Sequence, residues 1–522
     1  MLATLLSATL VALDGRVIRV EVDVAPGLPG FTIVGLGDAS IREARERVRG
    51  ALRNAGFVHP PRRITVNLAP ADVPKTGSAA DLAIAVGILI GSEQFVPLAG
   101  RAALIGEVSL GGEIRTVPGL LPMVAALARR RVGRVIVPAD GAAEARLVEG
   151  LEVVPVATLG DAVDALRKRR RAGPIRPARV EMAPTSVVAS SGPAVPALAP
   201  VLTPPDLADV RGQLEARRAL EVALAGGHGL LMIGPPGTGK TMLARTIPAL
   251  LPPLSDAQSL SATIVASVSG ETPISGLIRQ PPFRAPHHTS SYAAIVGGGP
   301  RLIPGEVTRA DGGVLFLDEL AEFSRDVLEA LRQPLEDGRV SIVRAAGAVT
   351  LPARFQLVAA MNPCPCGYAG VESRCSCAPL VPDRYVGRIS GPLRDRIDVW
   401  VTLARIPAGA MVGGLEPESS AVVAGRVAAA RERQLARPGS RLNARVSGRA
   451  LRTVAAMDRG AGERLAELAD SEMLSGRGTE RLLRVARTVA DLAESPVVGV
   501  EHLEEAARWR PPTAREQLAL AV

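Results

Sequence analysis

The chain has 522 residues, which is too many for one hydrophobic core, so we expect about three domains. Its 47% hydrophobic and 22% charged residues are ordinary for a globular protein, and no apolar stretch reaches the roughly 18 residues that a membrane-spanning helix needs. The net charge of +9 comes almost entirely from arginine, and it indicates either a polyanionic partner such as DNA or a general compositional bias. Aromatic residues make up only 2% of the chain, which argues against a base-stacking platform and favours contacts to a nucleic-acid backbone.

The first predicted domain, residues 1–168, alternates strand-like and helix-like patterns. Its apolar start lacks the basic region of a signal peptide, and Asp14-Gly15 predicts a turn between two strands, so we expect a cytoplasmic protein. Residues 40–53 carry a helical stripe, for which Ser40 is the expected N-cap.

Three further segments follow along the chain. Residues 169–205 are rich in arginine, proline, alanine and serine, and they predict an extended, semi-rigid linker or a segment that lies along a domain surface. Residues 206–405 contain the phosphate-binding motif described next, and we expect them to form the catalytic core. Residues 406–522 are predicted to form a helical C-terminal domain.

The most informative motif is GPPGTGKT, which follows the apolar run 230–233 and precedes a helical pattern. Its glycines allow the backbone N–H groups to surround phosphate, while Lys240 reaches the β- and γ-phosphates and Thr241 binds Mg²⁺. The start of the helix adds positive potential beneath the phosphates. This order of strand, loop and helix predicts an ATP site made by Gly234, Pro235, Pro236, Gly237, Thr238, Gly239, Lys240, Thr241 and Met242.

Further along, a second apolar strand ends in Asp318 and Glu319. We expect Asp318 to bind Mg²⁺ through water and Glu319 to polarise the water that attacks the γ-phosphate. A third buried strand precedes Asn362, whose amide is suited to orienting that water. Arg394 and Arg396 are both candidates for an arginine finger that acts across a subunit boundary, and their spacing does not choose between them.

The stretch between the lysine and the first acid is long. Asp318 lies 78 positions after Lys240 (318 minus 240), more than two strands of one sheet need, which indicates an insertion. Within it, residues 271–300 are rich in proline and glycine and are predicted to form a protruding loop. The loop contains His287 and His288, which could bind a metal, but no third ligand is evident and a structural role is favoured.

All four cysteines lie close together. Four thiols within fourteen residues, in a reducing compartment, suit a tetrahedral structural zinc ion, and the polar loop between them could not hold its fold by burial alone. Two redox-active or merely tolerated thiol pairs are the alternative. The residues concerned are Cys364, Cys366, Cys375 and Cys377.

Together these motifs resemble the AAA+ ATPases of the magnesium-chelatase-like group, specifically the ComM/YifB-like competence proteins. The strongest matches are GPPGTGKT, FRAPHHT, GGVLFLDEL, AAMNPCPCG, SGPLRDRIDV and RLLRVARTVADL. The resemblance covers essentially the whole chain and implies an α/β fold, with a P-loop domain and a helical lid, that assembles as a homo-hexameric ring with ATP between subunits. It implies that Asn362 is the sensor-1 residue, favours Arg396 as the finger, and makes Arg477 the sensor-2 arginine, with Arg481 as the alternative.

The family also resembles replicative MCM helicases, which direct two insertions into the central pore of the ring. In this chain these would be residues 271–300 and the hairpin 339–352. Arg344 lies beside the expected tip of that hairpin, and we expect it to grip the DNA backbone.

The first domain resembles the α+β domain of Lon-type proteases, on the residues PKTGSAAD at 74–81. Ala79 stands where the resemblance implies the nucleophilic serine, and Met123 stands near the expected lysine, so neither partner of the dyad is present. Lys75 and Ser78 could form a relocated pair, but we favour a structural or DNA-handling role and expect no peptidase activity.

The leading interpretation is an ATP-driven DNA motor, a helicase or branch-migration enzyme for recombination intermediates in DNA uptake or repair. One alternative is a chelatase subunit that drives Mg²⁺ into a porphyrin, although the N-terminal domain and the cysteine cluster are extra to a simple subunit of that kind. An ATP-dependent protease is disfavoured by Ala79 and Met123. A nucleotide switch without turnover is disfavoured by the intact Glu319 and the finger candidates.

Overall fold

The structure is a computed structural model that divides into two compact units. Unit 1 comprises Met1–Ala197, Ser259–Ile278 and Gly299–Pro304, and unit 2 comprises Leu198–Gln258, Arg279–Gly298 and Gly305–Val522. Nearly all of the predicted linker, residues 169–205, lies outside the described part of the chain. The residues described are 1–98, 102–167, 204–271, 273–299, 302–344, 347–370, 374–406 and 417–511.

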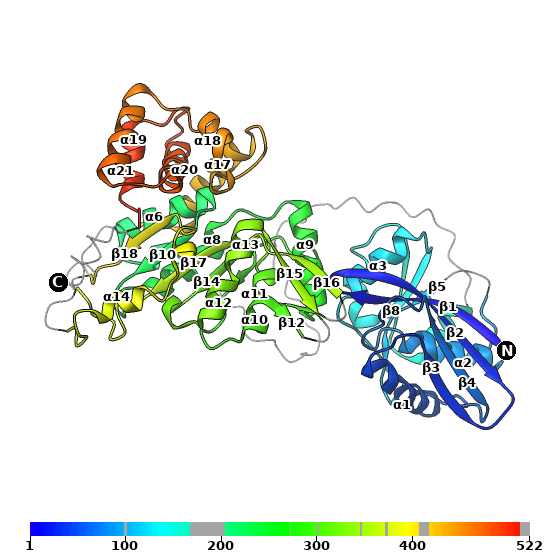
Figure 1. Cartoon of the computed structure of the whole chain (residues 1–522). Helices are drawn as coiled ribbons and strands as arrows, with labels where there is room; N and C mark the ends of the chain where they lie inside the picture. The colour runs from blue at the N-terminus through cyan, green and yellow to red at the C-terminus, as the bar shows by residue number, and fades with distance from the viewer. Residues whose placement is uncertain are drawn as a thin grey trace. The chain divides into compact units, whose positions relative to one another are not determined.

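Unit 1 is built on a seven-stranded mixed sheet with the strand order β3-β4-β2-β1-β5-β8-β9 (Figure 1). Strands β1 (Leu2–Val11) and β2 (Asp14–Ala25) are antiparallel, which confirms the predicted strand pair. The turn lies earlier than predicted, at residues 12–13, and Asp14 already belongs to β2. Alternate residues of β2 are buried against the core, as a strand with one covered face requires.

Helix α1 (Ala39–Asn54) confirms the predicted helix but not its predicted cap. The N-cap is Asp38, whose Oδ1 accepts a hydrogen bond from the backbone N–H of Ile41 at 3.0 Å, so the expectation for Ser40 was wrong. Asp38 Oδ2 also accepts from the N–H of Gly77 at 3.1 Å. The two oxygens of the Asp38 carboxylate can therefore accept from both backbone N–H groups at once.

Helix α2 (Asp81–Gly91) is buried along its whole length in the core of unit 1. The other elements of unit 1 are β3 (Gly30–Val34), β4 (Arg63–Ala69), β5 (Ala102–Leu104), β6 (Glu107–Val108), β7 (Ile114–Arg115), α3 (Leu120–Arg129), β8 (Arg134–Pro138), α4 (Ala142–Ala145), β9 (Glu152–Val156), α5 (Leu159–Arg167) and β13 (Ile303–Pro304).

Unit 2 contains a five-stranded sheet in which every pairing is parallel. Its inner strands are short apolar runs, typical of a sheet covered on both faces. Because the strands are parallel, all their carboxyl ends meet at one edge, called the carboxyl edge below, and all their amino ends at the opposite, amino edge. In spatial order the strands are β11 (Phe283–Arg284), β14 (Val314–Leu317), β17 (Gln356–Met361), β10 (Leu230–Ile233) and β18 (Val399–Thr402).

The prediction of a protruding loop at residues 271–300 was partly wrong. Strand β11 lies within that segment and is the outermost strand of the sheet, where it pairs in parallel with β14. The ring of Phe283 stacks on that of Phe316 with centroids 6.0 Å apart, and this contact joins the proline-rich stretch to the sheet. Helix α10 (Tyr292–Val296) follows in the same segment.

The hairpin predicted at 339–352 is confirmed as the antiparallel pair β15 (Arg339–Arg344) and β16 (Gly347–Pro352). The remaining helices and strands of the core are α6 (Leu214–Gly226), α7 (Lys240–Arg245), α8 (Ile247–Leu250), β12 (Gly297–Gly298), α11 (Glu306–Arg309), α12 (Arg325–Ala330), α13 (Arg332–Asp337), α14 (Val381–Val386) and α15 (Gly391–Arg394). Helix α9 (Asp256–Val268) begins in unit 2, and its residues from Ser259 onward belong to unit 1.

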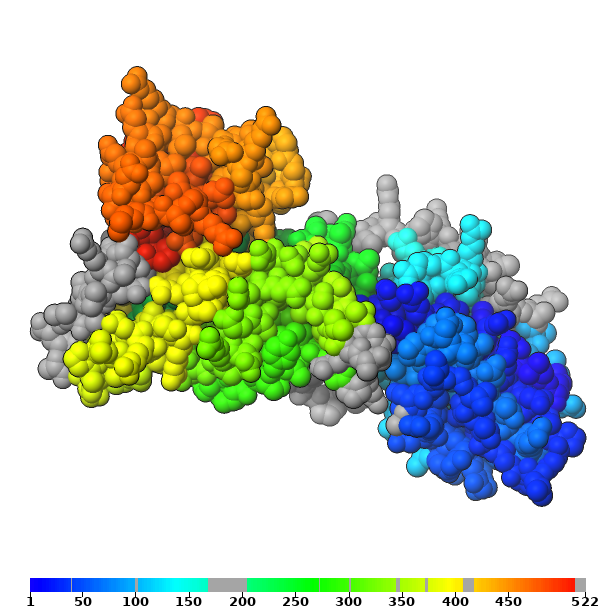
Figure 2. Space-filling view, viewed as in Figure 1, coloured from blue at the N-terminus to red at the C-terminus, as the bar shows by residue number. Residues whose placement is uncertain are grey.

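The end of the chain is helical, as predicted, and forms a lid whose helices α17 and α20 pack on α6. Figure 2 shows the surface of this lid (orange to red) directly against the yellow and green core of the same unit. Across the described residues, no helix has both the length and the apolar character that crossing a membrane requires. The lid helices are α17 (Ser420–Leu435), α18 (Gly448–Val454), α19 (Arg459–Ser471), α20 (Gly476–Leu492) and α21 (Val500–Ala507).

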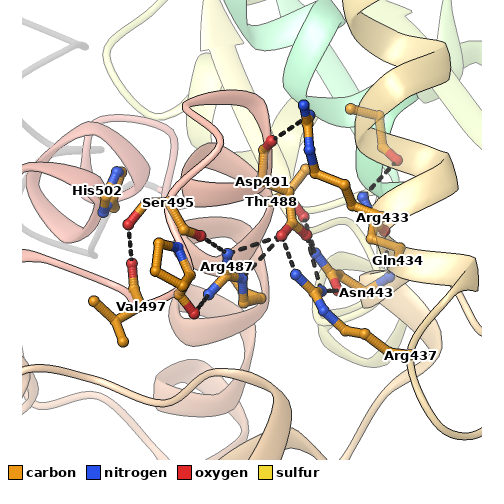
Figure 3. Close-up of polar contacts among 12 residues, drawn as sticks. Arg433, Gln434, Arg437, Asn443, Arg487, Thr488, Asp491, Ser495, Val497 and His502 are labelled. Atoms are coloured by element: carbon orange, nitrogen blue, oxygen red, sulfur yellow. Dashed lines mark hydrogen bonds and ion pairs between the residues drawn. The ribbon is translucent and has the colours of Figure 1, made fainter.

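A buried polar network holds α20 within the lid (Figure 3). Arg487 and Asp491 are each 1% exposed and form an ion pair at 2.8 Å. Asp491 also accepts from Arg437 at 3.0 Å and from the amide of Asn443 at 2.8 Å. A buried carboxylate is costly unless it is paired, so these donors fix the orientation of α20.

Candidate nucleotide-binding site

The glycine-rich loop begins directly where β10 ends. Gly237 and Gly239 have φ angles of 78° and 92°, in the left-handed region that favours glycine. At Gly234, a Cβ would lie 2.5 Å from the carbonyl oxygen of Leu403, so no side chain fits there. Helix α7 starts at Lys240, and its first N–H groups have no partner within the helix, which leaves them available for an anion.

Lys240 is enclosed by acceptors, with only 8% of its surface exposed. Its Nζ donates to two loop carbonyls, at 2.6 and 3.0 Å, and to Oδ1 of Asn362 at 3.1 Å. Burial lowers the pKa of Lys240, and the nearby charges of Asp318 and Glu319 partly offset that effect. The amine therefore donates to oxygen atoms within the protein, and phosphate oxygens can replace these acceptors when a nucleotide binds.

Thr241 and Asp318 come together from different elements. The hydroxyl of Thr241, in the first turn of α7, donates to Asp318 Oδ2 at 2.7 Å, and Asp318 directly follows β14. A hydroxyl beside a carboxylate provides hard oxygen ligands of the kind that Mg²⁺ prefers, so the pair fits a magnesium ion bound to nucleotide phosphates.

Glu319 contacts a histidine that the sequence argument assigned only a structural role. Its backbone is left-handed, with a φ of 55°, and its Oε2 lies 2.9 Å from Nδ1 of His288. The rings of His287 and His288 are in contact, with centroids 4.2 Å apart and planes tilted by 32°. The two histidines line a cavity of about 320 Å³ together with Thr241 and the acids. The contact was missed because 31 positions separate His288 from Glu319 (319 minus 288).

The arginines predicted to complete the site lie at the amino edge, away from the P-loop. Arg396 precedes β18, and Arg477 stands in the first turn of α20. Both line a cavity of about 480 Å³ that also includes Gly229 and Gln356, which mark the amino ends of β10 and β17. Its lining includes no P-loop residue.

The two candidate finger arginines, Arg394 and Arg396, lie in different environments. The guanidinium of Arg394 lies over the ring of Trp400, 5.4 Å from its centroid, and burial lowers the pKa of this arginine. Arg396 instead lines the cavity and pairs with Glu336. Arg481 does not line the cavity, whereas Arg477 does. Arg396 and Arg477 are thus the pair that the fold brings together.

The comparisons with known proteins agree with this geometry. Residues 206–411 match the family of magnesium chelatase, subunit ChlI, residues 20–141 match subunit ChlI of Mg-chelatase, and residues 417–510 match the ChlI C-terminal family. An uncharacterized protein of Mycobacterium tuberculosis is 46% identical over 96% of this chain and 97% of its own length. YifB of Escherichia coli is 42% identical over 94% of each chain, and the competence protein ComM of Haemophilus influenzae is 40% identical over 98% and 97%.

The chain belongs to the ComM/YifB-like family of magnesium-chelatase-like AAA+ proteins. The predicted family and the α/β fold class are therefore confirmed. Membership in the AAA+ group also supports an ATPase, and it implies ATP and magnesium as ligands of the site built above.

In this ComM/YifB-like chain the four cysteines do converge. All four Sγ atoms lie within 4.8 Å of one another, and those of Cys364, Cys366 and Cys375 are 3.3, 3.6 and 3.9 Å apart. Four thiolates around one zinc ion at about 2.3 Å place their sulfur atoms about 3.8 Å apart, so the cluster fits such an ion. A Cβ at Gly367, between the two cysteine pairs, would lie 2.8 Å from Pro236, so the cluster's loop lies against the P-loop.

The Lon-like region of unit 1 holds the predicted residues in separate environments. Ala79 and Met123 are buried in a hydrophobic cluster. Lys75 Nζ donates to the carbonyl of Pro70, and the Ser78 hydroxyl bonds the carboxylate of Glu107. The lysine and the serine proposed as a relocated pair therefore each have another partner.

Arg344, predicted to contact DNA, is the last residue of β15 and pairs with Gly347 across the hairpin. Its side chain and residues 345–346 lie outside the described part of the chain. The DNA contact of Arg344 stays a prediction.

Proposed function

We propose that this chain is a ring-forming ATPase that moves DNA strands, most concretely by branch migration of recombination intermediates in DNA uptake or repair. The observation that carries the proposal is the separation of Arg396 and Arg477 from the P-loop of their own chain. The carboxyl edge holds the lysine, the magnesium ligands and the base, but it still requires an arginine from a neighbouring subunit. A closed ring supplies one at every interface.

In the proposed mechanism, Lys240 and the first N–H groups of α7 bind the phosphates of ATP. Thr241 and Asp318 would hold magnesium, which when bound would neutralise part of the phosphate charge. Glu319 polarises a water and accepts its proton as the water oxygen bonds to the γ-phosphorus. The bond to the bridging oxygen of ADP breaks, and Asn362 orients the water.

The neighbouring subunit stabilises the transition state in this proposal. Its Arg396 approaches the γ-phosphate, where negative charge is spread over the equatorial oxygens, and its Arg477 approaches from the lid. Both arginines face the cavity at the amino edge, so one subunit can present them together. A homo-hexamer is the ring that the family resemblance implies.

DNA is the proposed partner because of charge and exposed loops. The net charge of +9 favours a polyanion, and the low aromatic content favours phosphate contacts over base stacking. The hairpin β15–β16 exposes Val343 near its tip, at 74%, with Arg344 next to it in sequence. The name of ComM as a competence protein in Haemophilus influenzae adds support.

For the cysteine cluster, we propose a structural zinc ion. It would hold the loop of Cys364 and Cys366 against the P-loop, where Gly367 approaches Pro236.

The test of this function is the ATPase rate measured without DNA and with single-stranded, duplex and branched DNA. The proposal predicts the largest stimulation by branched DNA. A rate that no DNA changes would contradict it. In the same preparation, a casein-like substrate should stay intact, since we propose no peptidase activity for unit 1.

The second candidate is an ATPase subunit of a chelatase, which the magnesium-chelatase family matches favour. It predicts ATPase stimulation by a porphyrin-binding partner and ATP-dependent insertion of Mg²⁺, with no response to branched DNA. The DNA assay above therefore separates the two candidates.

A further inference from the structure

A fully buried histidine joins three segments of unit 2. His228, between α6 and β10, is 0% exposed. Its Nδ1 lies 2.8 Å from Asp398 Oδ2, and its Nε2 lies 2.8 Å from the hydroxyl of Thr488 in α20. Because a carboxylate only accepts hydrogen bonds, Nδ1 donates to Asp398. The Thr488 hydroxyl lies within hydrogen-bond distance of both Nε2 and the backbone carbonyl oxygen of Arg484, the latter at 3.1 Å.

Asp398 connects this histidine to the segment that carries Arg396, the proposed arginine finger. It follows Arg396 by two residues, and its Oδ1 accepts from Arg484 Nη2 at 3.1 Å. Burial would raise the pKa of Asp398, but the hydrogen bond from His228 and the charge of Arg484 outweigh burial and hold it below its ordinary value. The carboxylate therefore stays charged and keeps both partners.

The lid reaches the same network through one face of α20. Arg477, Arg484 and Thr488 are spaced by seven and four residues, so they lie on one side of the helix. Arg477 and Arg484 line the cavity of Arg396, and Thr488 bonds His228. Thr488 also accepts from the amide of Asn443 at 3.0 Å, which ties it to the lid network of Figure 3.

Glycines beside His228 make these contacts sterically achievable. A Cβ at Gly226 would lie 2.2 Å from His228 Nε2 and 2.6 Å from the Thr488 hydroxyl. A Cβ at Gly229 would lie 3.0 Å from the carbonyl oxygen of Arg396. The segment Gly226-Gly227-His228-Gly229 thus lets the backbone approach the finger segment on one side and α20 on the other.

We propose that His228 is a positioning residue that couples the lid to the finger: through Asp398 and Thr488 it sets where Arg396 and Arg477 stand relative to each other. This inference rests on the proposed function, because it assumes that these two arginines complete the site of a neighbouring subunit. A movement of α20 would then reach Arg396 through a short chain of buried hydrogen bonds, with no contact to the nucleotide of its own subunit.

The test uses the full-length chain with Thr488→Val, which keeps the shape of the side chain but removes the hydroxyl. We expect kcat for ATP to fall by up to about 100-fold because the arginines are misplaced, with an unchanged Kd for a fluorescent ATP analogue. Thr488→Ser keeps the hydroxyl and should restore kcat. A weaker Kd with an unchanged kcat would overturn the inference.

Mixed rings give the readout that a merely structural role would not produce. Thr488→Val subunits keep a sound P-loop, and Lys240→Ala subunits keep sound arginines, so mixing the two should regain roughly a quarter of the wild-type rate through the whole interfaces that random mixing creates. No recovery, while a mixture of Arg396→Ala with Lys240→Ala does recover, overturns the inference and leaves the proposed function standing. If neither mixture recovers, the proposed function fails first.

A second variant covers the case in which Thr488→Val does not fold, as judged by circular dichroism. Asp398→Asn keeps the size of the side chain and weakens its bonds to His228 and Arg484. It should lower kcat, keep the nucleotide Kd, and recover in a mixture with Lys240→Ala. An unchanged kcat in Asp398→Asn would overturn the inference.

Discussion

The two edges of the sheet in unit 2 differ in how their polar groups are satisfied. At the carboxyl edge these groups bond to one another, with Lys240 on Asn362 and Thr241 on Asp318. At the amino edge Arg396 and Arg477 line a cavity, and among the described residues Arg396 forms an ion pair, with Glu336, whereas Arg477 forms none. In our proposal the carboxyl edge binds the nucleotide, and the amino edge presents its arginines to a neighbouring subunit. The proposal therefore has each chain fold fully and still lack a group that its reaction requires.

The largest expected effect follows from replacing the finger. Arg396→Ala should lower kcat by about 10³- to 10⁵-fold and leave ATP binding intact, because the arginine acts on the transition state of the neighbour. Arg394→Ala is the matched control two residues away. It loses the contact with Trp400 and should cost far less in kcat. A larger loss in Arg394→Ala, measured by steady-state ATPase assays, would reverse the assignment.

At the carboxyl edge, Glu319→Gln should lower kcat by about 10²- to 10⁴-fold, because the amide cannot accept the proton of the attacking water. Nucleotide binding should persist, since Lys240 and the loop are untouched. Rapid-quench measurement of the first turnover checks this. If ATP binding is lost along with hydrolysis, Glu319 has a structural role instead.

A substitution in the lid is expected to change the free energy of unfolding by about 3 kcal/mol. Arg487→Ala removes one partner of the buried Asp491 and should lower the free energy of unfolding of the lid by about that amount, although Arg437 still neutralises the carboxylate. Urea titration followed by circular dichroism measures the change. Exposed Arg459, 94% exposed in its side chain, gives the control Arg459→Ala, which should have little effect.

The cysteine cluster beside the P-loop can be tested for zinc. Cys364→Ser should reduce bound zinc from about one ion per chain and lower Tm, because structural zinc binding contributes directly to folding. Element analysis after gel filtration checks it. Wild-type protein that carries no zinc after purification without chelators would contradict the metal proposal and leave the thiol-pair alternative.

The smallest effect is expected in unit 1. Ser78→Ala removes the hydrogen bond to Glu107 and should leave the ATPase rate unchanged, since we propose no catalytic role for this serine. Any sustained cleavage of casein by the wild-type chain that Ser78→Ala abolishes would show that unit 1 is a peptidase.

The sequence predicted what is local and contiguous. The P-loop, the acids after β14 and the amide after β17 could be read because each follows an apolar strand, and parallel strands bring their carboxyl ends together. The N-cap of α1 was missed because Asp38 also binds the distant Gly77, which local pattern does not reveal. Strand β11 was missed because it is only two residues long and is defined by its pairing with the distant β14.

The amino edge was harder to predict because its residues are far apart in the sequence. Arg396 and Arg477 are 81 positions apart (477 minus 396), and only the family resemblance connected them. His228 carried no motif of its own, although the glycines on either side of it were a signal that backbone and side chains approach closely there. Arg344 and the linker remain predictions, since the described residues do not include the side chain or most of that segment.

The central claim is that hydrolysis needs the carboxyl edge of one subunit and the amino edge of another. The most direct measurement is the ATP turnover per subunit across a range of protein concentrations, with the fraction of assembled rings determined in the same samples by mass photometry. The account predicts that turnover rises in proportion to the ring fraction and vanishes for monomers. Monomers that hydrolyse ATP at the rate of rings would contradict it.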